Sequence, residues 1–366
     1  MRTFVALLLM FLLSQFAFAQ NVGAAFPAGT VAAEVDTDGY IPDPEASDAF
    51  AARIPKFIKD QVDILADDSD DKSAYIYRFL AKAKGEATLT TRNQKNEGSC
   101  VGYGTASSVD TLAAVEIFAF GEAEQFVPTN ADALYGLSRR NNLGAWQGST
   151  GSWSAEAISK VGTLHQLQYP TIDLRQEDPS NARRFRSRGV PKELYKFAEK
   201  RKVINVARVE TVKQLRGLLQ SGYPVFICST VGFNNGREGY MTWRDAQGFA
   251  TPRGSWAHCM TVYGYRGEST GRRGFLIGNS WKSEGHNVGP GRSYIGGGVH
   301  PEDQPFGSFW VDAQTMQRIL SAKDSWSVAG YQGFPKRKIT LKDAFTYPGG
   351  RERGLPESTP NFQIAP

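Results

Sequence analysis

The 366-residue sequence predicts an α+β fold with two lobes, because helical and strand-like patterns occupy different halves of its core. Between residues 100 and 120, apolar residues recur at helical spacing over most of the circumference, which is typical of a buried helix. After Val203, short β-prone runs separated by Gly-rich or charged turns replace that pattern. A cleft between a helical lobe and a β-rich lobe is then the expected position of a binding site.

Further elements are predicted in each half. Residues 154–161 are expected to form a second helix capped by Ser154, and residues 191–202 a third, amphipathic one. In the second half, three short runs rich in β-branched and aromatic residues are expected to be strands; they are residues 224–230, 260–263 and 274–277.

The ends of the chain differ in composition from its core. Residues 1–19 resemble an export signal, with Arg2, an apolar run from Phe4 to Phe16 and a small-x-small cleavage pattern at Ala17–Ala19. An uncleaved anchor is the alternative, but the run is shorter than the roughly 20 residues a spanning helix needs. We therefore expect a secreted or periplasmic protein without a membrane anchor after cleavage.

The rest of the chain divides into three segments. Residues 20–75 are expected to be a leader or pro-like segment in which no helix is evident. The core domain is expected at residues 76–334, with the helical lobe at about 76–200 and the β lobe at about 201–334. Residues 335–366 form a basic tail rich in Pro and Gly.

Composition and motif spacing exclude several classes of function. The 42 Lys and Arg exceed the 37 Asp and Glu by a net charge of +5, too dilute for a nucleic-acid-binding protein. We expect no metal and no cofactor, because no metal-ligand spacing and no complete phosphate or dinucleotide loop occurs. Other polar groups are expected at the surface: solvated loops at Asp67–Asp71 and Arg183–Arg188, and the side chains of His165, His286 and His300.

The three cysteines are an odd number, which leaves at least one thiol unpaired and excludes a disulfide scaffold. Cys100 follows a Gly-containing turn at the start of the buried helix. There the helix dipole and the free backbone N–H groups favour a thiolate and could hold an oxyanion. Gln94, six residues upstream, could supply a second oxyanion donor.

A histidine and an asparagine complete the pattern. His258 stands at the start of one predicted strand, and Asn279 lies at the end of the next, in a Gly-Asn-Ser-Trp motif that ends at Trp281. If the two strands are neighbours, the Asn279 side chain lies beside the imidazole of His258.

The order of these elements resembles that of the papain-like cysteine peptidases over roughly residues 76–334, as in an exported, divergent bacterial member of that family. The resemblance implies a two-lobed α+β fold with the active-site cleft between the lobes. It implies Cys100 as the nucleophile, His258 as the general base and acid, and Asn279 as the residue that orients His258. It also implies Gln94 as an oxyanion donor and Trp281 as a cover over the Asn–His hydrogen bond.

The sequence departs from the family pattern at several positions. Glu97 replaces a family disulfide cysteine, so that cross-link is expected to be absent, and Val101 replaces the aromatic residue next to the nucleophile. His258 and Asn279 lie further from Cys100 than is usual, which implies insertions.

The resemblance also implies substrate-binding residues. Gly148 and Gly151 lie where the family has a Gly-rich substrate-binding segment, and Ala257 directly precedes the predicted base. Cys228 and Cys259 are placed near the pocket for the second substrate residue upstream of the cut. A disulfide between these two is an alternative, but we expect them to be small, unbonded wall residues that do not react with thiol reagents.

Together these assignments predict a monomeric cysteine-type endopeptidase that hydrolyses polypeptide substrates through an acyl-enzyme intermediate. Val101 and the absence of an evident pro-segment motivate one alternative, a non-catalytic papain-fold binding protein. Another alternative keeps the nucleophile but passes the acyl group to an amine, as in a transpeptidase or an amidase acting on cell-wall peptides.

Overall fold

The computed structural model describes a defined part of the chain, namely residues 39–54, 72–120, 124–139, 146–233, 245, 249–267, 272–281, 304–305 and 307–331. Several sequence-based expectations lie outside these residues. They concern the export signal at 1–19, the acidic run at 67–71, His286, His300 and the tail at 335–366.

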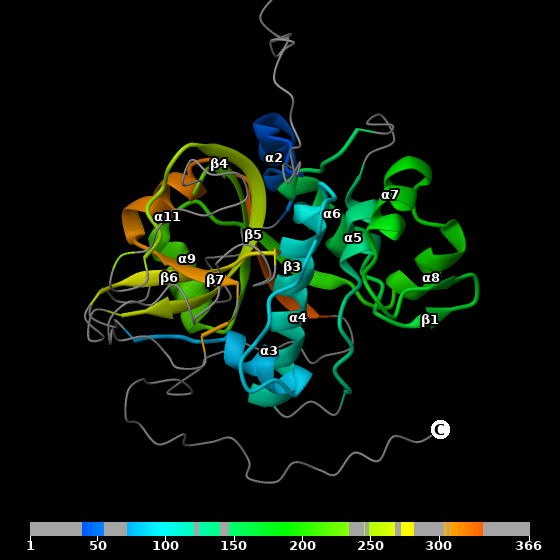
Figure 1. Ribbon diagram of the computed structural model, residues 1–366, viewed down its shortest axis with the longest axis horizontal. Helices are drawn as coiled ribbons and strands as arrows, with labels where there is room; N and C mark the ends of the chain where they lie inside the picture. Colours follow the sequence, from blue (N-terminus) through cyan, green and yellow to red (C-terminus); the bar gives the residue numbers. More distant parts are fainter. Residues whose placement is uncertain are drawn as a thin grey trace, which may run out of the picture. The chain divides into compact units, whose positions relative to one another are not determined.

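The β-rich half is a six-stranded antiparallel sheet with the strand order β3-β8-β4-β5-β6-β7. The last strand of the described residues, β8, therefore lies between β3 and β4, so β3 joins the rest of the sheet through β8. The strands are β3 (Val203–Arg208), β4 (Val225–Val231), β5 (Ser255–Arg266), β6 (Gly274–Gly278), β7 (Ser308–Val311) and β8 (Ser325–Tyr331). Two helices accompany this sheet, α9 (Val212–Gln220) and α11 (Ala313–Leu320) (Figure 1).

The other half is mainly helical and includes one small two-stranded sheet, β1 (Gln168–Tyr169) with β2 (Ile172–Asp173). Its helices are α3 (Tyr77–Lys84), α4 (Cys100–Phe120), α5 (Ala131–Ser138), α6 (Gly151–Lys160), α7 (Pro179–Arg188), the 3-10 turn η2 (Lys192–Leu194) and α8 (Tyr195–Ala198). The expected order of helices followed by sheet is therefore confirmed, and the fold class is α+β.

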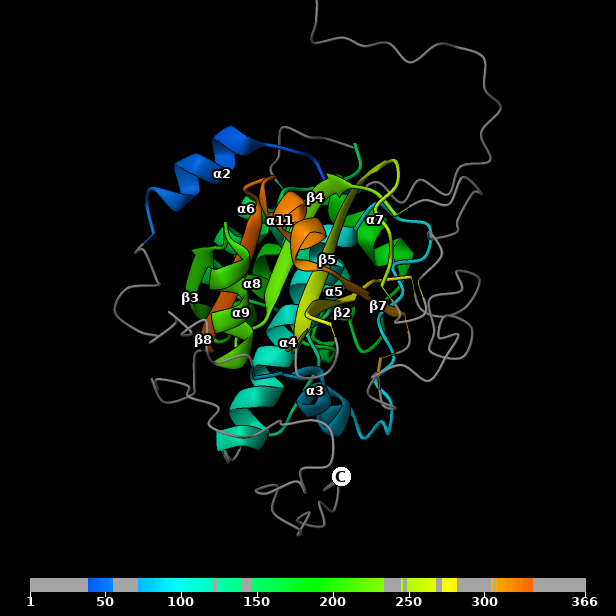
Figure 2. The same ribbon diagram turned by 90° about the vertical axis from the view of Figure 1, so that its left-hand side faces the viewer.

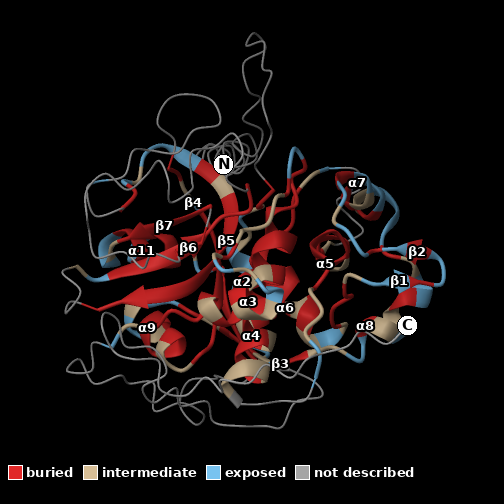
Figure 3. Cartoon of the chain, turned by 60° about the horizontal axis from the view of Figure 1, so that its bottom comes forward, coloured by how far each residue is buried: buried red, intermediate tan, exposed pale blue. Residues whose placement is uncertain are grey.

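Helix α4 is the central element, because two of its glycines allow close contact on both sides. A Cβ on Gly102 would lie only 2.6 Å from the carbonyl oxygen of Ala131 in α5. A Cβ on Gly104 would lie 3.1 Å from the backbone nitrogen of Met260 in β5. The helix is therefore packed between α5 and the sheet, and most of its side chains are buried (Figure 3).

Two predicted helices differ from the structure in their boundaries. Helix α6 begins at Gly151 rather than Ser154, because the Thr150 hydroxyl accepts a hydrogen bond from the Trp153 nitrogen at 3.0 Å and caps the first turn. The helix expected at 191–202 is shorter: it is the 3-10 turn η2 followed by the single turn α8. These residues contribute Leu194 and Ala198 to a second, smaller apolar core with α5 and α7.

The segment before the core domain also differs from the expectation. Helix α2 (Pro44–Ala51) lies within residues 20–75, where no helix was evident from the sequence, and begins with Asp43 as its N-cap. Phe50 on this helix is buried against Trp326 of β8, with ring centroids 5.2 Å apart. Helix α2 packs on α6 (Figure 2), so residues 39–54 are part of the folded protein.

Candidate active site

Cys100 is the first residue of α4 and is fully buried. Contacts further along α4 set its position relative to β5: Gly104 packs on Met260, and the hydroxyl oxygens of Ser108 and Thr261 are 2.6 Å apart. Because a helix rises about 1.5 Å per residue and a strand about 3.3 Å, one helical turn matches roughly two strand residues. One turn before Gly104, Cys100 therefore lies at the level of His258.

His258 and Asn279 come from neighbouring strands, as the sequence predicted. His258 lies in β5, Asn279 directly follows β6, and these strands pair antiparallel. The His258 Nε2 and Asn279 Oδ1 atoms are 2.7 Å apart, and both side chains are buried. Asn279 Oδ1 also accepts a hydrogen bond from the Ser280 nitrogen at 2.7 Å, which holds the amide in place.

Two tryptophans enclose the imidazole. The ring centroid of His258 is 4.7 Å from that of Trp281 and 5.3 Å from that of Trp256. The two indoles meet edge to face at 4.9 Å. The imidazole that bonds to Asn279 therefore lies between two indole rings, that of Trp281, which was predicted to cover this hydrogen bond, and that of Trp256, which was not singled out from the sequence.

Gln94 is buried beside the same motif. Its backbone nitrogen donates to the Ser280 carbonyl at 2.8 Å, and the Ser280 hydroxyl donates to its side-chain Oε1. Its Nε2 donates to the carbonyl of Glu97 at 3.0 Å. The adjacent residue, Asn93, forms a β-bridge with Trp281. The structure thus ties the predicted oxyanion donor to the Asn-Ser-Trp motif, 186 residues later in the sequence.

A segment of the chain itself lies along the candidate substrate-binding residues. The Tyr40 nitrogen donates to the Ala257 carbonyl at 3.2 Å, and the Ile41 nitrogen donates to the Ser149 carbonyl at 2.8 Å. The Ser149 nitrogen in turn donates to the Gly39 carbonyl at 3.0 Å. Residues 39–41 therefore pair with this edge in the extended manner of a bound peptide.

The glycines assigned to substrate binding have different roles here. Gly148, with φ +99°, packs against the segment, since a Cβ on it would lie 2.9 Å from Ile41 Cγ1. Gly151 lies deeper and donates its backbone N–H to the Asp324 carboxylate at 2.8 Å. The backbone pairing is made by Ser149, between them, which the sequence analysis did not single out.

The side chain of Tyr40 is buried and ends at Asp324. Burial raises the pKa of Tyr40, and the nearby Asp324 carboxylate raises it further. Burial also raises the pKa of Asp324 to about 6, against the hydrogen bonds that it accepts from Trp326, Gly151 and Tyr40. Neither residue carries a motif, so sequence reasoning missed both.

Cys228 and Cys259 are bonded to each other, which corrects the expectation that they are unbonded wall residues. They face each other in register on β4 and β5, so their side chains leave the same face of the sheet at adjacent positions. Both are fully buried. Cys259 is the neighbour of His258 in β5, so the disulfide joins the strand of the predicted base to β4. Cys100 is the cysteine that is not part of a disulfide.

Two further expectations are wrong. Residues 183–188 belong to helix α7 rather than to a solvated loop, because Asp178 caps the helix and Phe185 is buried beneath it. His165 is buried rather than exposed, and burial lowers its pKa to about 3. Glu97, for which the sequence analysis predicted neither burial nor exposure, is buried and forms an ion pair with Arg186.

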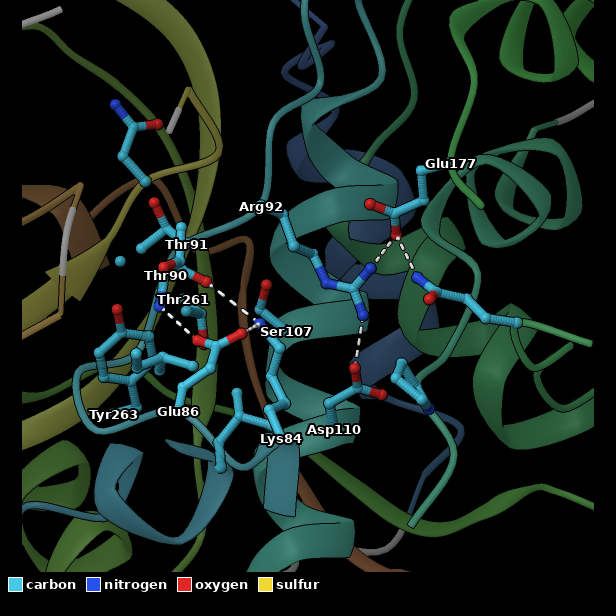
Figure 4. Close-up of a pocket in the computed structure, with 16 residues that line it drawn as sticks. Lys84, Glu86, Thr90, Thr91, Arg92, Ser107, Asp110, Glu177, Thr261 and Tyr263 are labelled. Atoms are coloured by element: carbon cyan, nitrogen blue, oxygen red, sulfur yellow. Dashed lines mark hydrogen bonds and ion pairs between the residues drawn. The ribbon is translucent and has the colours of Figure 1, made fainter. Parts of the chain in front are cut away.

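A cavity of about 260 Å³, shown in Figure 4, is lined in part by Gly278 and Asn279. Arg92 stands at one side between the carboxylates of Asp110 and Glu177 and contacts both. Burial raises the pKa of Asp110, although Arg92 lowers it. This network links Arg92, two residues before Gln94, to Asp110 of α4.

Two searches for other kinds of site concern the described residues alone. In this part of the chain, no three His, Cys, Asp or Glu side chains gather closely enough to hold a metal ion. No helix within the described ranges has the length and apolar character needed to cross a membrane.

No protein-family model matches the sequence, and neither does any curated protein. The structure is similar to solved structures of cysteine proteases. Xylellain from Xylella fastidiosa has 16% identity and a TM-score of 0.49, with 82% of this chain and 98% of xylellain covered. ProCathepsin B S9 from Trypanosoma congolense has 12% identity and a TM-score of 0.47, covering 83% and 88%. Bromelain from Ananas comosus, in complex with the E64 inhibitor, has 14% identity and a TM-score of 0.39, covering 70% and 98%.

Proposed function

We propose that the protein is a cysteine-type endopeptidase that acts on polypeptides outside the cytoplasm. The observation that carries the proposal is the buried His258–Asn279 pair, 2.7 Å apart, at the level of a cysteine outside the disulfide that begins a helix. A cysteine, a histidine and an orienting amide in this arrangement are the components of acyl transfer through a thiolate.

Each residue has a defined role in the proposed reaction. Asn279 accepts from His258 Nε2 and thereby presents the other ring nitrogen, Nδ1, to the thiol. The helix N-terminus and the imidazolium stabilise the Cys100 thiolate, which attacks a peptide carbonyl. Gln94 Nε2 and the Cys100 N–H hold the oxyanion, His258 protonates the leaving amine, and water hydrolyses the acyl-enzyme.

The protein as described is proposed to be latent, with residues 39–51 as an inhibitory segment. Residues 39–41 occupy the backbone positions where an extended substrate would pair, and the segment is anchored beyond them. Ser47 donates to the Lys323 carbonyl, and Asp48 pairs with Arg208 at 2.5 Å. Substrate must displace these contacts before it reaches Cys100.

The test uses the full-length chain and an unfolded casein-type protein as substrate. Tyr40→Ala removes a buried side chain from the segment and should raise the cleavage rate over the parent. Cys100→Ala should abolish cleavage both in the parent and in the Tyr40→Ala protein. Ser107→Ala, on the same helix, should leave cleavage unchanged. Cleavage by the Cys100→Ala protein at the parental rate would refute the mechanism.

Two outcomes would favour the other functions. Tight peptide binding by reduced Tyr40→Ala protein without any turnover would indicate a binding protein. Products joined to an added amine, detected by mass in a mixed peptide–amine incubation, would indicate acyl transfer rather than hydrolysis.

A further inference from the structure

The Glu97 carboxylate is buried three residues before the proposed nucleophile, where a charge is costly unless it is paired. Its Oε1 lies 2.8 Å from Nη1 of Arg186, and its Oε2 lies 3.8 Å from Nη1 of Arg183. Both arginines stand on the same face of α7, one turn apart. The negative charge is therefore matched by a helix 89 residues away in the sequence.

The backbone of Glu97 is a centre of hydrogen bonds in the loop before α4. Its carbonyl accepts from Gln94 Nε2 at 3.0 Å and from the Ser99 nitrogen at 2.7 Å. The next residue, Gly98, donates its backbone N–H to Gln147 Oε1 at 2.6 Å. A movement of the Glu97 side chain would therefore be passed to the loop that carries the proposed oxyanion donor.

The orientation of the Gln94 amide depends on this carbonyl. The amide nitrogen has two hydrogens, and one of them is donated to Glu97. The amide oxygen is held by the Ser280 hydroxyl. With one hydrogen and the oxygen fixed, the second hydrogen has a defined direction and is the one available to an oxyanion.

The partner helix is rigid enough to act as an anchor. Asp178 caps α7 by accepting from the Ser180 nitrogen at 2.8 Å. Phe185, next to Arg186, is buried against α5, where a Cβ on Gly136 would lie 2.5 Å from Phe185 Cβ. The Arg186 guanidinium therefore starts from a backbone that is packed into the helical core.

We propose that the Glu97–Arg186 ion pair is a positioning element that aligns Gln94 for the oxyanion by fixing the Glu97 carbonyl. The inference rests on the proposed peptidase function, because the aligned group acts only in acyl transfer. Glu97 itself touches neither substrate nor the reacting atoms, so its effect passes through Gln94.

The experiment measures kcat and KM for peptide hydrolysis by full-length protein carrying Tyr40→Ala, the variant expected to loosen the inhibitory segment. Glu97→Ala and Arg186→Ala should each lower kcat about tenfold, less than the about 10²–10³ expected for Gln94→Ala. KM should change by less than about twofold, since a transition-state contact is lost. Arg186→Lys should retain most of the rate, and Arg188→Ala, an exposed residue of α7, should have no effect.

A comparison in the Gln94→Ala background separates positioning from a merely structural role. Without the amide, Glu97→Ala should lower kcat by less than about twofold, because the group that it positions is already absent. An equal loss of kcat in both backgrounds, or no loss in either, would overturn the inference. If Glu97→Ala does not fold, Glu97→Gln, which keeps the shape but removes the charge, replaces it.

The two proposals fail in different ways. Absence of any Cys100-dependent cleavage in the Tyr40→Ala protein would refute the peptidase function and this inference together. Cys100-dependent cleavage with full rates in Glu97→Ala would refute the positioning role alone.

Discussion

The two sides of the candidate active site are held by different kinds of interaction. On the β side, His258 is fixed by a disulfide at the adjacent residue, by strand pairing and by two tryptophan rings. On the other side, the loop from Gln94 to Ser99 is held by hydrogen bonds and by the ion pair between the buried Glu97 and the half-buried Arg186. The first set depends on covalent and apolar contacts, whereas the second depends on charge and polar geometry, so substitutions should affect the two sides differently.

The largest expected effect is on stability, from loss of the disulfide. Cys228→Ala with Cys259→Ala removes a cross-link over a sequence separation of 31. The chain-entropy relation gives a loss of about 3–4 kcal/mol in the free energy of unfolding. Urea unfolding at neutral pH measures this free energy of unfolding, with the reduced parent protein as the control. Unchanged stability would mean that β4 and β5 need no cross-link.

Asn279→Ala should cause the next largest effect, on activity. Without the Asn279 oxygen as partner for its Nε2, the His258 imidazole can rotate. Misplacement of a catalytic group costs about 10²-fold in kcat. The measurement is steady-state peptide hydrolysis in the Tyr40→Ala background. A kcat within about twofold of that background would show that the two tryptophans alone orient His258.

The β side also contains a titrating group. The folded-state pKa of Asp324 is raised by burial to about 6 from 3.8, so its stabilising contribution is present below pH 3.8 and is lost as the pH rises through 6. Asp324→Asn removes this dependence. Thermal unfolding between pH 4 and 8 should therefore show the variant gaining stability relative to the parent as the pH rises from 4 to about 6, with a constant difference above pH 6. If the unfolding temperatures of the two proteins change with pH in parallel, the raised pKa of Asp324 is contradicted.

Ser280→Ala should have the smallest effect, because it removes only one hydrogen bond from the Gln94 amide. We expect a loss of about threefold to tenfold in kcat, with the His258 side intact. Ser107→Ala is the matched control. A loss as large as that of Asn279→Ala would mean that the polar contacts of the loop matter as much as the orientation of the base.

The sequence predicted the residues of the site that belong to local motifs. Cys100 begins a helix with a clear apolar period, and His258 and Asn279 stand at the ends of β-prone runs, so strand pairing alone brings the last two together. The α+β order of the elements followed from the same periodicities.

Other features depend on contacts between distant segments, which no local pattern records. Tyr40 and Asp324 are in contact although most of the sequence lies between them. Neither residue stands out from its sequence neighbours. The Cys228–Cys259 bond requires the exact register of β4 and β5, which apolar alternation does not specify. The burial of Glu97 was missed because its partner lies on a helix whose arginine-rich sequence resembles a loop.

The most direct test of the account is the alkylation rate of Cys100, followed by intact mass and peptide mapping in the Tyr40→Ala protein and in the same protein with His258→Ala. A thiol activated by the imidazole should give one adduct, on Cys100, and His258→Ala should slow its formation at pH 6 by about tenfold or more, because the thiolate is lost. Equal rates in the two proteins, or no adduct on Cys100, would contradict the thiolate–imidazolium pair on which the proposed function depends.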